Sequence, residues 1–193
     1  INTWNLLSAI CYLLFAICYL LSNLLSLNVT KTSFIIFGRK KNLTANIYIN
    51  NVLIQRQHDT KFLGVILSAD LKWNKHIDIV TNKVLKNIGI IAKARHLLPQ
   101  HLTRTLYLTL VDPYVSYCNL VWSLSHATTK LDRIYKLQKK FCRLITFSNF
   151  TAHSRPLFQH LSILSVYDKY KYQLLIHVYK SSHNLISNHY SCQ

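Results

Sequence analysis

The sequence contains no glutamate, and its few carboxylates are aspartates that stand singly along the chain. Six acidic residues occur among 193, at Asp59, Asp70, Asp78, Asp112, Asp132 and Asp168. Two-metal phosphoryl transfer and paired acid and base catalysis both need carboxylates that cluster. The absence of a close pair argues against a self-contained metal-dependent polymerase or nuclease, and it predicts no catalytic residue and no metal site in this chain.

Cysteine pairs are absent as well. The cysteines number five, and none form a Cys-x-x-Cys pair. An odd count without this spacing argues against a zinc ribbon or a disulfide framework and suits a reducing compartment, which favours the nucleus or the cytoplasm. His183, His189 and Cys192 have no partner knuckle, and we interpret them as ordinary surface residues.

Negative charge is scarce compared with positive charge. The chain carries 23 lysines and arginines against 6 acidic residues, which gives a formal net charge of +17. Such an excess indicates a polyanionic partner, either nucleic acid or an acidic membrane surface. Because 50% of the residues are apolar, the chain can still build the core of one ordinary domain or two small ones.

Residues 1–27 form a separate apolar segment. Within it LLSAICY (6–12) is followed at once by LLFAICY (13–19), a tandem copy with one change. The neutral run reaches the roughly 20 residues of a membrane span only if it extends through Leu27. A membrane helix or an uncleaved signal-like segment is one interpretation, but a local duplication that lengthened a buried helix explains the repeat better.

Residues 28–72 are expected to form a small antiparallel β unit. The alternating stretch IYINNVLI (47–54) is centred on Asn50-Asn51, which tolerates the left-handed conformations of a tight hairpin turn. KFLGVIL (61–67) predicts a further buried strand, in which Gly64 marks a bulge or a site of close backbone approach.

Residues 73–193 are expected to be mainly helical. Apolar spacings of three and four predict a helix over 75–98 that ends before Pro99, and a second over 100–122 that Pro113 kinks or divides. In the second helix the expected buried residues are Leu102, Leu106, Leu110, Tyr114, Tyr117, Cys118 and Val121. The fold class is therefore α+β, a small β-hairpin unit followed by a helical bundle, with Trp73, Ile77, Leu106, Tyr117, Trp122, Leu131 and Phe141 in the core.

Two further helices complete this pattern. A helix from Ser165, where Ser165 and Asp168 have the spacing of a capping box, closes the bundle. The helix over 130–145 has two distinct faces, a seam of Leu131, Ile134, Gln138, Phe141 and Ile145 and a basic face of Arg133, Lys136, Lys140 and Arg143. Four like charges without an intervening aspartate repel one another unless a polyanion lies near, which favours phosphate contact over an ordinary solvated face.

Four collinear blocks resemble the closing part of reverse transcriptases from non-LTR, LINE-type retrotransposons of the jockey-like kind. These blocks are LSLNVTKTSFIIF (25–37), KFLGVILSADLKWNKHI (61–77), YLTLVDPYVSYCNLVW (107–122) and KLQKKFCRLIT (136–146). The resemblance implies that Lys31 matches a palm lysine beside the incoming nucleotide, and that Phe62, Leu63 and Gly64 match the primer grip, a β-hairpin that holds the primer end. It also implies that the helices that follow form a thumb. From the residues alone, a solvated lysine and a structural bulge are the alternatives.

The sequence departs from this family in one decisive respect, since no Tyr-x-Asp-Asp motif occurs in it. The resemblance therefore implies a fragment with the palm end (28–72) and thumb (73–193), without catalytic aspartates, with Mg²⁺ needed only by the intact enzyme. Its expected partners are RNA or an RNA–DNA hybrid, together with the missing palm and fingers. Two alternatives stay open, a basic protein anchored to a membrane through residues 6–27 and a relic without function.

Overall fold

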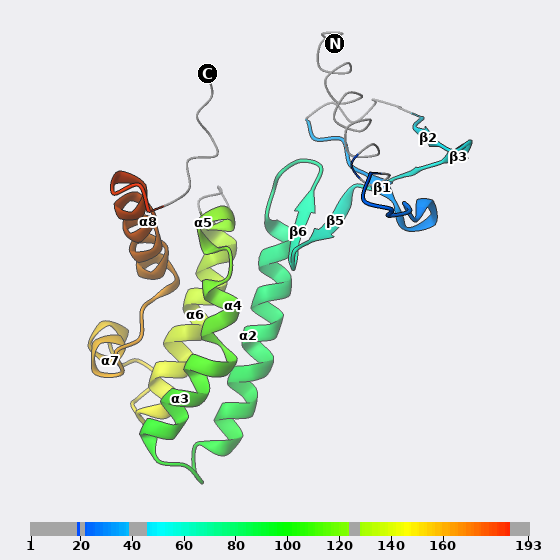
Figure 1. Cartoon of the computed structure of the whole chain (residues 1–193). Helices are drawn as coiled ribbons and strands as arrows, with labels where there is room; N and C mark the ends of the chain where they lie inside the picture. The colour runs from blue at the N-terminus through cyan, green and yellow to red at the C-terminus, as the bar shows by residue number, and fades with distance from the viewer. Residues whose placement is uncertain (1–18, 20–21, 39–45, 124–127, 186–193) are drawn as a thin grey trace. The chain divides into compact units, whose positions relative to one another are not determined.

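The computed structural model describes residues 19, 22–38, 46–123 and 128–185 (Figure 1). The tandem apolar repeat lies almost entirely outside these residues, as do His189 and Cys192. The chain divides into two compact units, residues 1–60 and 61–193. The boundaries expected after residues 27 and 72 stay predictions. No helix within the described ranges has the length and apolar character to cross a bilayer.

The first unit contains short strands in two separate pairs. After the 3₁₀ turn η1 (Val29–Lys31), strand β1 (Ser33–Phe34) pairs in parallel with β4 (Gln55–Arg56), while β2 (Tyr48–Ile49) pairs antiparallel with β3 (Val52–Leu53). Asn50 and Asn51 connect the antiparallel pair with φ angles of 50° and 60°, so the expected tight hairpin is confirmed. The parallel pair is a departure from the all-antiparallel expectation.

A second hairpin consists of β5 (Asp59–Phe62) and β6 (Val65–Ser68), and its turn is Leu63-Gly64. Both turn residues have positive φ, 45° and 85°, as a two-residue turn of the I′ type requires. The strand with a bulge at Gly64, predicted from the residues alone, is therefore wrong, whereas the β-hairpin that the resemblance implies at these residues is present. The apolar run folds back on itself because its glycine adopts the left-handed region without steric cost.

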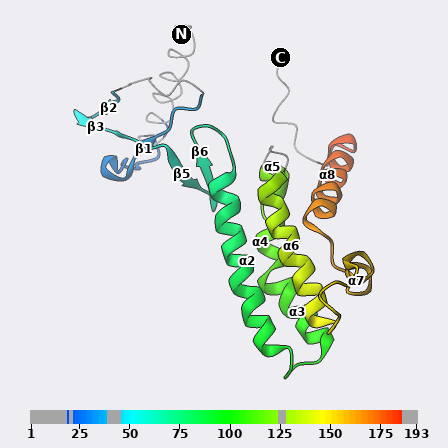
Figure 2. The same cartoon turned by 180° about the vertical axis from the view of Figure 1, so that it is seen from behind.

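The helices of the second unit lie side by side in both views (Figures 1 and 2). Helix α2 (Asn74–Ala94) packs along α6 (Thr128–Ile145), and α3 (Gln100–Leu110) contacts both. Two short helices, α4 (Asp112–Ser116) and α5 (Asn119–Trp122), follow α3, and α7 (Ser154–His160) and α8 (Val166–Ser182) come last. The α+β fold class is confirmed.

The termini of these elements follow local chemistry. The Asp70 carboxylate accepts from the Lys72 amide at 3.0 Å, which shapes the turn before α2. Pro113 lies in the first turn of α4, where its missing N–H costs nothing, so the expected division at this residue is confirmed. Ser165 caps α8 by accepting from the Asp168 amide at 3.1 Å, as the capping-box spacing predicts.

The core forms between α2, α3, α4 and α6. Of the predicted core residues, four are buried and two are half-buried against the core, namely Ile77, Trp122, Leu131 and Phe141, then Trp73 and Leu106. Tyr117 was expected in the core and is instead 51% exposed. The helix over 100–122 breaks at Val111 and at the left-handed Cys118. Its buried residues still recur at spacings of three and four, and Tyr117 lies outside this row, which consists of Thr103, Tyr107, Val111, Val115, Asn119 and Trp122.

The buried face lies one residue along from the predicted one, and this shift is already present in α3, before the first break. Tyr107, Val111, Val115 and Trp122 are buried, while Leu102, Tyr114, Tyr117 and Val121 are exposed. Tyr107 stacks on Phe141 with ring centroids 4.4 Å apart, which gives it a larger packed contact than a neighbouring leucine would have.

Gln138 lies at the centre of this core and is fully buried. Its amide nitrogen donates to the Tyr107 hydroxyl at 2.8 Å and to the Leu164 carbonyl at 3.3 Å. Its amide oxygen accepts from the Val166 N–H at 2.9 Å. One side chain thus connects α6 to α3 and to the first residue of α8.

Replacing Gln138 with leucine tests the importance of this network. The apolar side chain leaves the buried Tyr107 hydroxyl and Val166 N–H without partners, each at a cost of about 1–3 kcal/mol if unrelieved. We expect Gln138→Leu to lower the free energy of unfolding by about 2–4 kcal/mol in urea denaturation followed by circular dichroism. The exposed Gln159→Leu is the matched control, with a change within about 0.5 kcal/mol. Equal effects of the two substitutions would contradict the assigned role.

Candidate nucleic-acid interface

The turn of the second hairpin presents apolar side chains to solvent. Phe62 is 61% exposed and Leu63 is 73% exposed. Phe62 stands at the end of β5, and with Leu63 it gives the turn two adjacent exposed apolar residues.

A tyrosine from the helical bundle fixes the turn in place. The Tyr117 hydroxyl donates a hydrogen bond to the Leu63 carbonyl. A Cβ at residue 64 would lie 3.5 Å from a ring carbon of Tyr117, so the ring rests against the glycine backbone. The close approach that the sequence predicted at Gly64 is thus made by a side chain of this chain.

Beside the turn lies an open pocket of about 300 Å³. Its lining residues are Gly64, His76, Ile79, Val80, Lys83, Pro113, Tyr114 and Tyr117. The Lys83 ammonium lies 4.8 Å from the centre of the Tyr114 ring, in cation–π geometry. The pocket thus combines one cation with two tyrosines next to the candidate primer-grip residues Phe62, Leu63 and Gly64.

His76 forms the inner wall of this pocket. It is 5% exposed, and its Nδ1 accepts a long hydrogen bond of 3.4 Å from the Ile66 amide of β6. Its ring meets the Trp122 ring edge to face, with centroids 5.8 Å apart. Burial, and to a lesser degree the charge of Lys83, lower the pKa of His76 below its usual value. The imidazole is therefore neutral where it supports β6.

The basic face of α6 is partly committed to internal contacts. The Asp78 carboxylate of α2 accepts from Lys130 at 2.5 Å and from Arg133 at 3.3 Å. The Nε of Arg143 donates to the Ala152 carbonyl at 2.9 Å. On α6 itself Asp132 lies one turn before Lys136 but accepts from the Tyr167 hydroxyl, and the fold brings Asp78 to the basic face from the neighbouring helix.

Arg133, Lys136 and Lys140 are exposed members of this face, but Arg133 pairs with Asp78, which leaves Lys136 and Lys140. Within the described ranges neither one forms an ion pair. The buried seam opposite them is confirmed in full, since Leu131, Ile134, Gln138, Phe141 and Ile145 are all buried. The inward seam therefore holds these lysines on the outside of the bundle.

Lys31 lies in the first unit, at the last residue of η1, and its side chain is exposed. The Asn28 side chain accepts from the Lys31 amide at 3.2 Å and from the Thr30 hydroxyl at 2.7 Å, which orders this turn. The exposed Lys31 side chain is accessible to a partner. Its role beside an incoming nucleotide stays a prediction.

All six aspartates are engaged in contacts, among them Asp59 and, with Lys72, Asp70. Asp112 pairs with Lys169, Asp132 accepts from the Tyr167 hydroxyl and Asp168 accepts from the Ser165 hydroxyl, in addition to Asp78. In the part of the chain that the structure describes, no three His, Cys or Asp residues gather as a metal site requires. These donors do not fit the Mg²⁺ pair of a polymerase.

The structure adds residues that the sequence reasoning missed, namely His76, Lys83 and Tyr114, and it gives Tyr117 a different place. Tyr114 and Tyr117 both follow Pro113 and are three residues apart, so they lie near one another on the same side of the chain. That signal was available in the sequence. The docking of the turn onto Tyr117 was not, because the two segments are separated by 54 residues.

Comparison with known proteins shows which proteins the sequence is similar to. The chain is a homologue, over most of its length, of RNA-directed DNA polymerases from non-LTR transposons. It is 28% identical over 149 residues to the probable RNA-directed DNA polymerase from transposon X-element of Drosophila melanogaster, a match that covers 75% of this chain and 16% of that protein.

A second relative is the RNA-directed DNA polymerase from mobile element jockey of Drosophila funebris, 25% identical over 167 residues, with 85% of this chain and 18% of that protein covered. The chain thus spans less than a fifth of each relative. No protein-family model matches the chain, and no solved structure gives a significant match. The relatives do not favour the alternative of a membrane-anchored basic protein.

The neutral state of His76 generates a prediction about pH. The folded state lowers the pKa of His76, so the unfolded chain binds the proton more readily. The stability that the neutral residue contributes is therefore present above pH 6.5, the pKa in the unfolded chain, and is lost as the pH falls below it. We expect the free energy of unfolding to rise with pH up to about 6.5, and His76→Gln to flatten that rise. Urea denaturation across this pH range measures it. The exposed His101→Gln should leave the slope unchanged, and a slope that His76→Gln also preserves would contradict the assignment.

Proposed function

We propose that this chain is the palm-end and thumb-like part of a non-LTR reverse transcriptase, and that it binds RNA or an RNA–DNA hybrid through phosphate contacts without performing catalysis itself. The carrying observation is the outer face of α6, where Lys136 and Lys140 are exposed and unpaired within the described ranges. A net charge of +17 and the names of two relatives support the same partner class.

Phosphate contact is the chemistry that suits these side chains. Lysines and arginines on the outside of a helix reach the sugar–phosphate backbone, which carries no base information. Arg133 and Arg143 keep free guanidinium donors in addition to those used by Asp78 and Ala152, since each guanidinium has five N–H groups. All four members of the basic face can therefore contribute to binding.

The hairpin turn has a separate proposed role as a primer grip. Phe62 and Leu63 are exposed apolar residues on a turn that Tyr117 holds from behind. A primer strand that passes the turn would meet Phe62, Leu63 and the backbone of Gly64, with Lys83 nearby. Lys31, in the first unit, takes the position of the palm lysine in this proposal.

The chemistry of DNA synthesis would come from elsewhere in an intact polymerase. Clustered carboxylates that hold Mg²⁺ are needed for it, and the aspartates here are dispersed and engaged. The missing palm and fingers are therefore the proposed protein partner, and Mg²⁺ is needed only when they are present.

The salt dependence of binding tests the phosphate-contact proposal. Each neutralised phosphate contributes roughly −0.7 to −0.9 to the slope of log K against log salt concentration. We expect the 193-residue chain to bind an RNA–DNA hybrid with little sequence preference. Changing Arg133, Lys136, Lys140 and Arg143 together to Gln should flatten the slope by about two to four. Lys136→Gln with Lys140→Gln should flatten it by about one to two.

The matched control places the same charge change on another helix. Lys171 and Lys180 are exposed residues of α8, and their double replacement by Gln should leave the slope nearly unchanged. Equal losses from the α8 and α6 double variants would show only general charge attraction. A slope that the quadruple variant preserves would refute the assigned face.

The proposal also makes a prediction about activity. We expect no primer extension by the purified chain on a primed RNA or DNA template with Mg²⁺ or Mn²⁺, because two-metal catalysis needs clustered carboxylates. A primer-extension assay with radiolabelled nucleotide checks this outcome, with an active reverse transcriptase as the positive control. Extension that co-purifies with the chain through several columns would overturn the proposal.

A further inference from the structure

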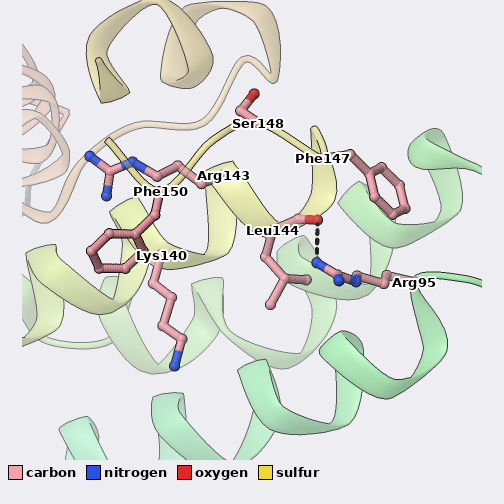
Figure 3. A pocket seen from close by; sticks show the side chains of 7 residues that line it. All are labelled: Arg95, Lys140, Arg143, Leu144, Phe147, Ser148 and Phe150. Atoms are coloured by element: carbon pink, nitrogen blue, oxygen red, sulfur yellow. Dashed lines mark hydrogen bonds between the residues drawn. The ribbon is translucent and has the colours of Figure 1, made fainter. Parts of the chain in front are cut away.

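A second pocket lies where the C-terminal end of α6 meets the C-terminal end of α2. It measures about 300 Å³ and is lined by Arg95, Lys140, Arg143, Leu144, Phe147, Ser148 and Phe150. Figure 3 shows Phe147 beside Arg95 and Phe150 beside Arg143, with Lys140 near Phe150. The lining contains three cations and no aspartate. The volume is at the lower end of that of pockets that bind small organic ligands.

Main-chain carbonyls hold the two arginines of this pocket. An Nη of Arg95 donates to the Leu144 carbonyl at 3.0 Å, as the dashed line in Figure 3 marks, and the Nε of Arg143 donates to the Ala152 carbonyl at 2.9 Å. These contacts use one or two of the five N–H groups of each guanidinium, so the remaining donors stay available to an anion. Fixed guanidinium groups bind phosphate with little loss of conformational freedom.

The two phenylalanines are unusually exposed for their size. Phe147 is 63% exposed and Phe150 is 78% exposed. Each has an arginine near its ring, since the guanidinium carbon of Arg95 lies 5.1 Å from the centre of Phe147 and that of Arg143 lies 5.8 Å from the centre of Phe150. One arginine occupies only part of a ring, so flat apolar surface remains open beside the cations.

The backbone at Phe147 is in a conformation that glycine favours. Phe147 has a φ angle of 51°, and the Ser148 amide bonds back to the Arg143 carbonyl at 3.0 Å. This arrangement ends α6 in the manner of a Schellman motif, in which the left-handed position is usually glycine. A bulky aromatic residue here is strained, and such strain is typical of binding sites.

We propose that this pocket binds an unpaired nucleotide of single-stranded RNA or DNA, with its base against Phe147 or Phe150 and its phosphate at Lys140 and Arg143. The inference rests on the proposed function of nucleic-acid binding and adds a base contact to it. Aromatic rings stack on any base, and cations beside them bind the backbone. A site for phosphate alone would gain nothing from two exposed rings.

Two substitutions remove the aromatic surface and leave the charge unchanged. Phe147→Gly should leave the stability unchanged or raise it, since glycine adopts the left-handed conformation without strain. Phe150→Ala removes a ring that is 78% exposed and should not disturb the core. The probe is a fluorescent oligouridylate of about eight nucleotides, a length typical of single-strand sites, measured by fluorescence anisotropy.

We expect the substitution that removes the ring under the base, Phe147→Gly or Phe150→Ala, to raise the Kd for the oligouridylate about tenfold. For an abasic oligonucleotide with the same number of phosphates, the parent and both variants should have the same Kd. Tyr172→Ala, which removes a 55% exposed ring from α8, is the control and should change neither Kd.

The outcomes separate this inference from the proposed function. Unchanged oligouridylate binding by Phe147→Gly and Phe150→Ala, with hybrid binding by the parent intact, would overturn the pocket assignment alone. An equal loss for the abasic oligonucleotide would overturn it too, because the effect would then not depend on a base. A parent chain that binds neither the hybrid nor the single strand would overturn the proposed function and this inference together.

Discussion

The buried amide of Gln138 is the contact on which the arrangement of the helical unit depends. It makes three hydrogen bonds, to Tyr107 on α3, to Leu164 and to Val166 at the start of α8. A buried polar group can be satisfied in few orientations, so these bonds fix the rotation of α6 about its axis more tightly than apolar packing alone. Once that rotation is fixed, Lys136 and Lys140 must face solvent. The position of the basic face is thus a consequence of a polar contact in the core.

A second polar contact joins α8 to α4. Lys169 of α8 is 8% exposed, and its ammonium contacts the Asp112 carboxylate and, at 2.9 Å, the Ser116 hydroxyl. A buried ion pair adds little net stability, but it penalises alternative packings that would leave either charge alone. Gln173 adds a bond of 3.1 Å to the Ser116 carbonyl. These contacts hold α8 against α4, the helix that immediately precedes Tyr117 and so places the tyrosine beside the hairpin turn.

Charge and exposed aromatic surface coincide at two places in the helical unit. Lys83 and Tyr114 lie beside the turn of Leu63 and Gly64, and Arg95, Arg143 and two phenylalanines lie at the end of α6. Exposed rings that contact cations recur in proteins that bind single-stranded nucleic acid, because a ring stacks on bases while the cation attracts phosphates. In the function proposed above, nucleic acid is the common partner of these two places, and catalysis belongs to other parts of an intact polymerase.

The sequence by itself determined the helical faces that depend on local period, the seam of α6, the cap at Ser165, the Asn50-Asn51 hairpin and the excess of positive charge, because each arises from residues close along the chain. Only the tertiary structure decided the remainder. The contact of Tyr117 with Leu63 and the pairing of Asp78 with Arg133 join segments that lie 54 or 55 residues apart. The buried face over 100–122 lies one residue along from the predicted one, since Tyr107 stacks on Phe141 and bonds to Gln138 of α6, contacts that no local pattern shows. Local patterns fix which surface of an element is apolar, whereas long-range packing alone fixes which partners reach it.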